Sequence, residues 1–233
     1  MFSLDHNFIG KILTDTLPSY QITDPPTANL GFGFLFYGLV RVLRPKTMVI
    51  IGSKKGFAPV VFGIGAKDNE GVGHKTITDR SAPPTSTGSP EIFFVDPSYS
   101  VHRKDADHWY GIGAWDEESV VTERWRAFGI ESIIRHFKMR SDEFAISELC
   151  PANIDLLFID GDHSFSGIAT DLTMFSRRMK RDAIIVMHDV APGLARLLPN
   201  SGGYEVLQEF VDDRFEYVRI PVFPGLAIMR LRR

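Results

Sequence analysis

The sequence predicts an α/β protein with a doubly wound, mostly parallel sheet that ends in an antiparallel hairpin. Short apolar runs alternate along the chain with longer segments of helical length. Runs such as residues 154–159 are almost continuously apolar, which is typical of strands buried on both faces of a parallel sheet. The last two runs, residues 215–220 and 226–231, are joined by a short connection that contains Pro and Gly and favours a hairpin.

The chain of 233 residues is long enough for one large domain, residues 29–233, preceded by an N-terminal appendage, residues 1–28. We expect the appendage to be helical and to lie over a ligand as a lid. Hydrophobic residues make up 44% of the sequence and charged residues 24%, as in ordinary globular proteins. The net charge of -3 gives no general attraction to nucleic acid.

The single cysteine, Cys150, excludes an intrachain disulfide and is compatible with a reducing cytoplasm. The first ten residues lack the basic-then-apolar order of a signal peptide. The longest apolar stretch, residues 30–40, is interrupted by glycines and is shorter than the roughly 20 residues that a membrane span needs. We therefore expect a cytoplasmic protein without a membrane partner.

Two helices are predicted before the first strand, over residues 8–17 and 30–43. The run T-M-V-I-I at residues 47–51 predicts a strand, and an apolar helix over residues 58–66 follows it. The turn between them reads G-S-K-K-G-F. Strand, glycine turn and helix in this order open a Rossmann-like nucleotide-binding unit.

The glycine turn contains Gly52, Ser53, Gly56 and Phe57. Glycines let the backbone approach a ligand closely, and the following helix offers free N–H groups at its start. However, the turn lacks the full G-x-G-x-x-G pattern of dinucleotide binders and the hydroxyl residue that ends a P-loop. By itself it favours a plain tight turn over ligand binding.

Residues 67–90 are polar and rich in Gly, Pro, Ser and Thr, and we predict a mobile excursion there. The next strand, residues 92–95, ends in Asp96, and an acidic residue at this point is the usual partner of ribose hydroxyls. The loop after it is rich in rings, which either cover a ligand or simply pack the loop down. These rings belong to His102, His108, Trp109, Tyr110 and Trp115.

A helix over residues 118–128 is predicted to stop at Gly129, and a strand follows over residues 132–137. Ser141 would cap a helix over residues 142–149.

The strand over residues 154–159 ends in the polar cluster Asp160-Gly161-Asp162-His163. Open α/β sheets bind their ligands at the carboxyl ends of the strands. Two carboxylates and an imidazole at that edge are more than a turn needs. Asp162 as the N-cap of the next helix explains that one residue equally well.

A helix with a basic end is predicted over residues 165–179, and a buried strand over residues 183–187. This strand ends in His188-Asp189, so it brings a second polar pair to the same edge. A helix over residues 204–211 precedes the terminal hairpin.

Together these motifs resemble the class I S-adenosylmethionine-dependent methyltransferases. The glycine turn, the acidic end of the second strand and the polar ends of two later strands occur in that family's order. The subgroup that is most similar includes macrolide-sugar O-methyltransferases and cephalosporin hydroxylase-like proteins. The resemblance covers residues 30–231, and its most specific parts are the stretches I-D-G-D-H-S-F and M-H-D-V.

The resemblance implies a binding site for S-adenosylmethionine. Its methionine part would contact the glycine turn at Gly52, Ser53, Gly56 and Phe57, while Asp96 would hold the ribose hydroxyls. Ser141 and Asp142 would lie beside the adenine, with Asp160 next to the cofactor.

The resemblance also implies catalytic groups. His163 would be the general base, and Asp160 would act beside it. Asp160, His188 and Asp189 would bind Mg²⁺ or another divalent metal. Two positions depart from the family's pattern. Ile50 stands where an acidic residue is usual, and His188 where an acidic residue or asparagine is common; imidazole suits transition metals better than magnesium.

The leading hypothesis is methyl transfer to a hydroxyl of a small molecule, for which His163 has a suitable pKa as a base. A divalent ion would acidify the bound hydroxyl. Two other functions fit the same residues. A metal-dependent hydrolase would use the acidic and histidine cluster, including Asp162, without S-adenosylmethionine. A non-catalytic S-adenosylmethionine-binding protein would tolerate Ile50. Neither nucleic acid nor membrane is an expected partner, and a homo-oligomer is compatible with all three functions.

Overall fold

A computed structural model describes residues 4–16, 23–70, 88–97, 115, 118–198, 200–211 and 213–232. Most of the predicted excursion at residues 67–90 lies outside the described residues. The same holds for four of the five rings predicted to follow the second strand, namely His102, His108, Trp109 and Tyr110.

The described strands form one seven-stranded sheet in the order β3-β2-β1-β4-β5-β7-β6. The first five strands along the chain are parallel, and the last two run antiparallel to their neighbours. The strands are β1 Thr47–Ile51, β2 Glu91–Val95, β3 Ile134–Phe137, β4 Ile154–Ile159, β5 Met179–His188, β6 Phe215–Ile220 and β7 Leu226–Leu231. The predicted doubly wound, mostly parallel sheet with a terminal hairpin is therefore confirmed.

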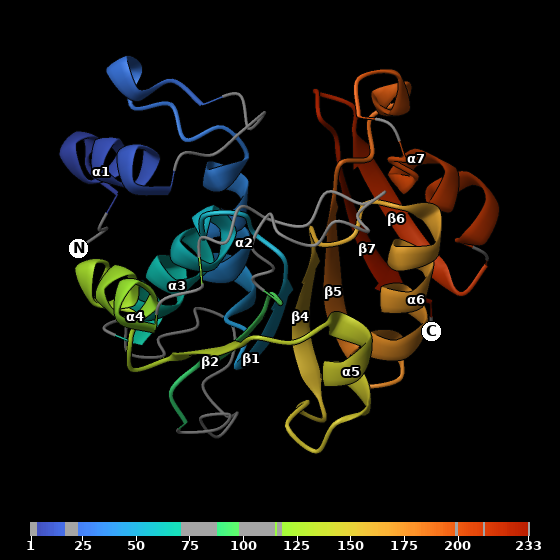
Figure 1. The fold of residues 1–233 in the computed structure, drawn as a ribbon, viewed down its shortest axis with the longest axis horizontal. Helices are drawn as coiled ribbons and strands as arrows, with labels where there is room; N and C mark the ends of the chain where they lie inside the picture. The colour runs from blue at the N-terminus through green and yellow to red at the C-terminus, as the bar shows by residue number, and fades with distance from the viewer. Residues whose placement is uncertain are drawn as a thin grey trace, which may run out of the picture.

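Helices cover both faces of this sheet (Figure 1). One face carries α1 His6–Thr16, α2 Phe32–Leu43, α3 Phe57–Glu70 and α4 Glu118–Ala127. The other carries α5 Ser141–Ile146, α6 Phe165–Ser176 and α7 Gly203–Glu205. Three short turns complete the elements: η1 Pro25–Thr27, η2 Leu194–Arg196 and η3 Val206–Phe210.

Alternate residues of the central strands feed two hydrophobic cores, one on each face. In β1, Met48 and Ile50 belong to the core under α2 and α3, whereas Val49 and Ile51 belong to the core under α6. All four are almost completely buried. This explains why the strand reads as a continuous apolar run. It also shows that Ile50, at the position where the family usually has an acidic residue, is a core residue.

Several predicted boundaries are wrong. The helix predicted to reach Met179 ends at Ser176, because Met179 already pairs with Ile154 of β4 as part of β5. The helix predicted over residues 204–211 is a single α-turn followed by a wider π-turn. The first of these boundaries was decided by pairing with a distant strand, which is not visible in local spacing.

The start of α5 also differs from the prediction. Ser141 is the first helical residue, and Arg140 occupies the N-cap position. The carboxylate of Glu143 accepts a hydrogen bond from the backbone N–H of Arg140 at 3.1 Å. The helix ends at Ile146 rather than at Leu149.

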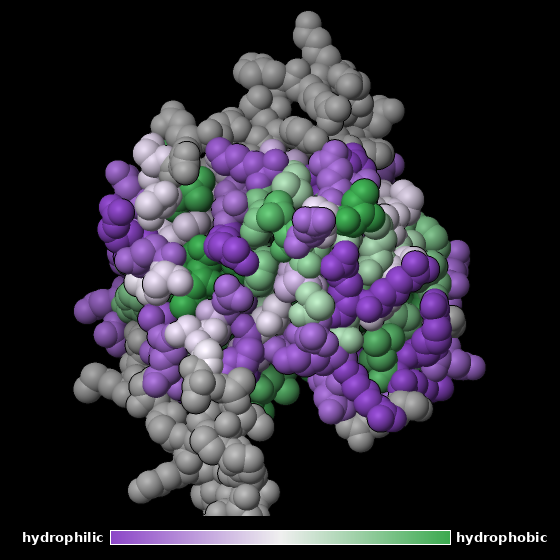
Figure 2. Space-filling view, turned by 90° about the horizontal axis from the view of Figure 1, so that it is seen from below, coloured by the Kyte–Doolittle hydropathy of each residue, from purple (hydrophilic) through white to green (hydrophobic). Residues whose placement is uncertain are grey.

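Figure 2 shows the molecule from below, the side on which the parallel strands begin. Hydrophilic residues there surround scattered hydrophobic ones. A hollow of about 470 Å³ on the described chain is lined by Pro45, Asp155, Lys180 and Arg181, among others. Within the described part of the chain, no helix combines the length and the apolar character needed to cross a lipid bilayer.

Candidate functional site

The carboxyl ends of three neighbouring strands meet at one point. Ile51 of β1 is paired with Val95 of β2 on one side and with Ile159 of β4 on the other. The backbone continues these pairings one residue further, because the N–H of Gly52 donates to Val95 and the N–H of Asp160 donates to Ile51, each at 2.9 Å. Gly52, Asp96 and Asp160 are thus brought together at one edge of the sheet.

The conformation of the glycine turn requires glycine at both ends. Gly52 has φ +69°, and a Cβ there would lie 2.3 Å from the carbonyl oxygen of Asp160. Gly56 has φ +87°, and a Cβ there would lie 2.6 Å from the ring of Trp115. These positive φ angles and close contacts explain both glycines.

Ser53 and Phe57 support the turn. Ser53 is buried, and its hydroxyl accepts a hydrogen bond from the N–H of Ala58 at 3.1 Å, in the first turn of α3. Phe57 is the first residue of α3 and is also buried. The Ser53 hydroxyl therefore ties the turn to α3, while the Phe57 ring packs against Phe36 of α2 in the core.

Asp96 follows β2 directly and is 8% exposed. Its backbone carbonyl is 3.1 Å from Nε2 of His136, a residue of β3 that no motif of the sequence marks. Burial lowers the pKa of His136 to about 4, so the ring is neutral at pH 7. A neutral ring stacked on Phe94 supports the end of β2 without adding a charge to the site.

Ser141 and Asp142 begin α5, which follows β3, the neighbour of β2. Arg140 forms an ion pair with Asp142 at 3.0 Å, and this hydrogen-bonded contact lowers the pKa of Asp142. The hydroxyl of Ser141 is hydrogen-bonded to Asp171 of α6. Asp171 is 2% exposed, and burial raises its pKa to about 7. Nothing in the spacing of the sequence pointed to this buried carboxyl group.

The ends of β4 and β5 form a cluster of charged side chains. Nδ1 of His188 lies 3.0 Å from an oxygen of Asp160 and 3.0 Å from an oxygen of Asp189. Nδ1 of His163 lies 3.3 Å from the other oxygen of Asp189. All four residues, predicted from two separate stretches, are therefore in one cluster.

Within this cluster the two histidines have different environments. His188 is 4% exposed, while the side chain of His163 is 29% exposed. Burial alone would lower the pKa of His188, but Asp160 and Asp189 outweigh it and raise this pKa well above its usual value. Burial would raise the pKa of Asp189, but His188 and then His163 hold it below its usual value. His163 is thus the histidine of this pair that faces the surface.

Asp162 has a local structural role. Its carboxylate accepts a hydrogen bond from the N–H of Ser164 at 2.9 Å. Ser164 is the N-cap of α6, because its hydroxyl accepts from the N–H of Gly167 at 3.0 Å. The alternative in which Asp162 itself caps the helix is therefore wrong by two residues. Asp162 shapes the turn that presents His163.

The ligand atoms of Asp160, His163 and Asp189 all lie within 4.8 Å of one another, a spacing that fits a metal ion. The set differs from the predicted one, since His163 takes the place of His188. His188 is instead placed against both carboxylates.

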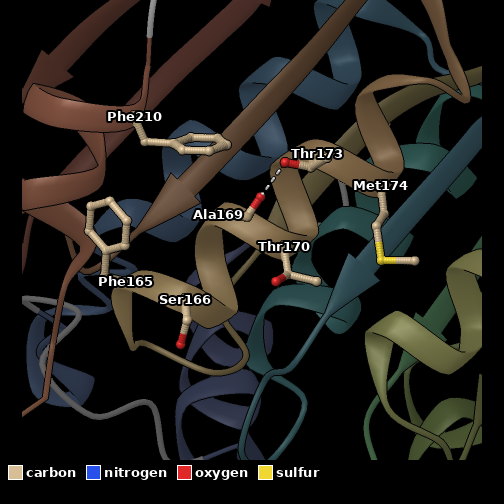
Figure 3. A pocket seen from close by; sticks show the side chains of 7 residues that line it. All are labelled: Phe165, Ser166, Ala169, Thr170, Thr173, Met174 and Phe210. Carbon is tan, nitrogen blue, oxygen red and sulfur yellow. Dashed lines mark hydrogen bonds between the residues drawn. The ribbon is translucent and has the colours of Figure 1, made fainter.

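A shallow groove of about 410 Å³ lies along the outer side of α6 (Figure 3). It begins at Phe165, two residues after His163, and is lined by Thr170, Met174 and Phe210 among others. Its lining residues include no acid, base or thiol. The groove is therefore a feature of shape and hydrophobicity rather than a second chemical centre.

The strand order, the glycine turn and the acidic strand ends together define a class I methyltransferase-like α/β protein. A sequence profile described as a methyltransferase domain matches residues 49–190, which is more than half of the chain. The protein therefore belongs to this methyltransferase family, and the resemblance seen in the sequence is confirmed. No curated protein sequence matches the chain.

Several solved structures share the fold at low sequence identity. A putative O-methyltransferase from Klebsiella pneumoniae gives a TM-score of 0.63 at 13% identity, over 99% of this chain and 92% of that one. A methyltransferase from Podospora anserina, solved with SAH bound, gives 0.62 at 17% identity over 99% and 89%. The O-methyltransferase TomG from Streptomyces achromogenes, involved in tomaymycin synthesis and solved with SAM, gives 0.61 at 13% over 100% and 92%.

Proposed function

We propose that the protein transfers a methyl group from S-adenosylmethionine to a hydroxyl of a small molecule. The observation that carries this proposal is the meeting of Gly52, Asp96 and Asp160 at one edge of the sheet. Membership of a methyltransferase family supports it, as does the fold shared with O-methyltransferases of bacterial origin. The cytoplasm stays the predicted compartment, and residues 1–28 stay a predicted lid.

The chemistry of the edge fits the cofactor. The carboxylate of Asp96 is the acceptor that two ribose hydroxyls require, and the turn at Gly52 offers backbone without a Cβ for the methionine part. Ser141 and Asp142 would lie at the adenine. When bound, S-adenosylmethionine supplies a methyl group that its sulfonium already activates.

The chain's own task is to hold the acceptor oxygen in line and to take its proton. His163 is the proposed base, because its ring is partly exposed at the edge and its Nδ1 faces Asp189. Asp189 would fix the orientation of the ring, since one of its oxygens lies 3.3 Å from Nδ1. Asp160 would border the space between donor and acceptor.

The spacing of Asp160, His163 and Asp189 favours a second version of the site, in which these residues hold a divalent ion. When bound, such an ion would supply Lewis acidity toward the acceptor hydroxyl. His163 would then be a ligand and not the base. Loss of methyl transfer after chelation, restored by one added divalent metal, is the result expected of this version. Full activity in excess chelator contradicts the metal-bound version and favours His163 as the base that takes the proton of the acceptor.

The first test is calorimetric titration of S-adenosylhomocysteine into three proteins: wild type, Gly52→Ala and Gly129→Ala. Both glycines have a similar positive φ, but a Cβ at Gly129 would meet nothing within 4 Å. The control therefore carries the same backbone strain without the clash and away from the site. We expect wild type and Gly129→Ala to bind and Gly52→Ala to lose binding.

The absence of binding by wild-type protein contradicts the proposal and favours the hydrolase. Binding without methyl transfer to any of a broad set of phenols, sugars and other hydroxyl compounds favours the non-catalytic function. Transfer of labelled methyl to one class of acceptor identifies the substrate.

A further inference from the structure

The middle of the glycine turn is held by a helix that has no predicted part in the site. A guanidinium N–H of Arg124, on α4, donates a short hydrogen bond to the backbone carbonyl of Lys55. On the other side of the same peptide unit, the N–H of Gly56 donates to the carbonyl of Ser53 and closes the turn. The Lys55–Gly56 peptide is thus fixed at both ends.

The turn that is fixed in this way is strained. Lys54, next to Lys55, has φ +33°, a conformation that residues with a side chain rarely adopt. Such strain persists only where the surroundings impose it, and it is concentrated at functional sites. The contact from Arg124 lies one residue from this strained position, so it is well placed to impose the conformation.

Arg124 is itself anchored by aromatic residues. Its guanidinium lies 5.1 Å from the centre of the Trp115 ring, within range of a cation–π contact. Trp115 stacks on Trp125 of α4 at 5.2 Å, and both indoles press against the position of Gly56. Trp115 and Trp125 are at most 4% exposed, so they form a rigid support.

The environment of Arg124 is costly for a charge. Partial burial lowers its pKa, although the group remains charged at neutral pH. The charge of Asp15 opposes this effect of burial, and the Lys55 carbonyl and the Trp115 ring are the groups that contact the guanidinium directly. A hydrogen bond from a charged donor is stronger than one between neutral groups.

We propose that Arg124 is a positioning residue for the cofactor turn. Through the Lys55 carbonyl it holds the strained backbone between Gly52 and Gly56 in the conformation that receives the methionine part of S-adenosylmethionine. The inference rests on the proposed function, because it assigns a role in cofactor binding to a residue remote from the reacting atoms.

Two experiments test the role of Arg124. The first compares wild type, Arg124→Ala, Arg124→Lys and the matched control Arg126→Ala, which removes an exposed arginine of the same helix. We expect Arg124→Ala to raise the Kd for S-adenosylhomocysteine about tenfold. The KM for the methyl donor should rise equally, and kcat at saturating donor should stay within about twofold. Arg124→Lys should be intermediate, since an ammonium can donate to the carbonyl but stacks less well on Trp115. Arg126→Ala should match wild type.

The second experiment adds Lys54→Gly, because glycine adopts φ +33° without strain. If Arg124 acts by imposing this backbone, Lys54→Gly should restore part of the affinity lost in Arg124→Ala. A role confined to overall stability predicts no such rescue.

The possible outcomes are distinct. A folded Arg124→Ala protein that binds S-adenosylhomocysteine like wild type overturns the inference and leaves the proposed function standing. Wild-type protein that does not bind it overturns both. If Arg124→Ala does not fold, the test uses Arg124→Lys and the double variant Arg124→Lys/Lys54→Gly. The inference is overturned if both of these proteins bind S-adenosylhomocysteine as tightly as wild type.

Discussion

The two ends of β4 carry carboxylates with different partners. At the amino end, one oxygen of Asp155 accepts hydrogen bonds from the backbone N–H groups of Lys46 and Thr47, each at 2.9 Å. Its other oxygen is paired with Lys180 at 2.7 Å. At the carboxyl end, Asp160 lies against His188 in the cluster that also contains His163.

The difference shows that residue type does not assign function on a sheet. Asp155 holds the start of β1 against β4, so its oxygens are used for structure. Asp160 emerges at the carboxyl edge, where parallel strands run into the loops that follow them. This is the edge at which open α/β sheets bind their ligands. The amino edge should therefore govern stability, and the carboxyl edge should govern chemistry.

His163→Ala should give the largest effect of the substitutions considered. If this variant kept the wild-type rate, the contrast between a chemical carboxyl edge and a structural amino edge would no longer hold. Removal of a general base costs about 10²- to 10⁴-fold in kcat. The free energy of unfolding should change by less than about 1 kcal/mol, because the ring is partly exposed. The measurements are methyl transfer at saturating donor and denaturant unfolding. His163→Gln, which keeps a polar group beside Asp189, is the control and should be equally inactive. Wild-type rates in both variants exclude His163 as the base.

Asp171→Asn sharpens the comparison with a carboxyl group that is near the site but buried. The pKa of Asp171 is raised from 3.8 to about 7 by burial, and Asp162 and Asp142 add to this while Ser141 and Arg140 oppose it. Between these pH values the unfolded chain has released the proton and the folded protein keeps it. Stability therefore falls as the pH rises through this window.

At about 1.4 kcal/mol per pH unit, the loss reaches about 4 kcal/mol at most. We expect the free energy of unfolding of Asp171→Asn to lack this fall with pH. Its stability relative to wild type should therefore increase from pH 4 to pH 8. Chemical unfolding of the ligand-free protein across that range measures it. Parallel curves for the two proteins contradict the prediction.

Asp155→Ala tests the amino edge. Two backbone N–H groups would lose their charged acceptor, so the protein should be destabilised by about 2–3 kcal/mol. Activity per folded molecule should stay near that of wild type. A large fall in kcat with unchanged stability would reverse the roles that we assign to the two ends of β4.

Lys180→Met gives the smallest effect and is the matched control for Asp155→Ala. It removes the ion pair but leaves both backbone contacts of Asp155 intact. The side chain of Lys180 is 44% exposed, and pairs of this kind contribute about 0–1 kcal/mol. A melting temperature close to that of wild type is expected. Destabilisation as large as that of Asp155→Ala would place the stabilising interaction in the ion pair.

Much of the fold could be predicted from the sequence, because its signals are local. The apolar run of β1 and the Gly52 turn lie within a dozen residues of each other, as do β4 and its polar end. The predicted end of α6 was wrong because a residue distant in the sequence fixes it. Residues 177–178 suit a helix, but Met179 pairs with Ile154, and that strand pairing fixes where α6 ends.

By itself, the sequence determined the order of strands and helices and placed Asp96, Asp160 and His188 at strand ends. These features depend on hydrophobic periodicity and on turn residues, which act over a few positions. Only the tertiary structure decided which charged groups become partners. Asp155 accepts a hydrogen bond from Lys46, which is 109 positions away in the sequence, and Arg124 donates one to Lys55, which is 69 positions away. Such contacts form when elements pack, and their energies depend on burial and distance, which no local pattern encodes.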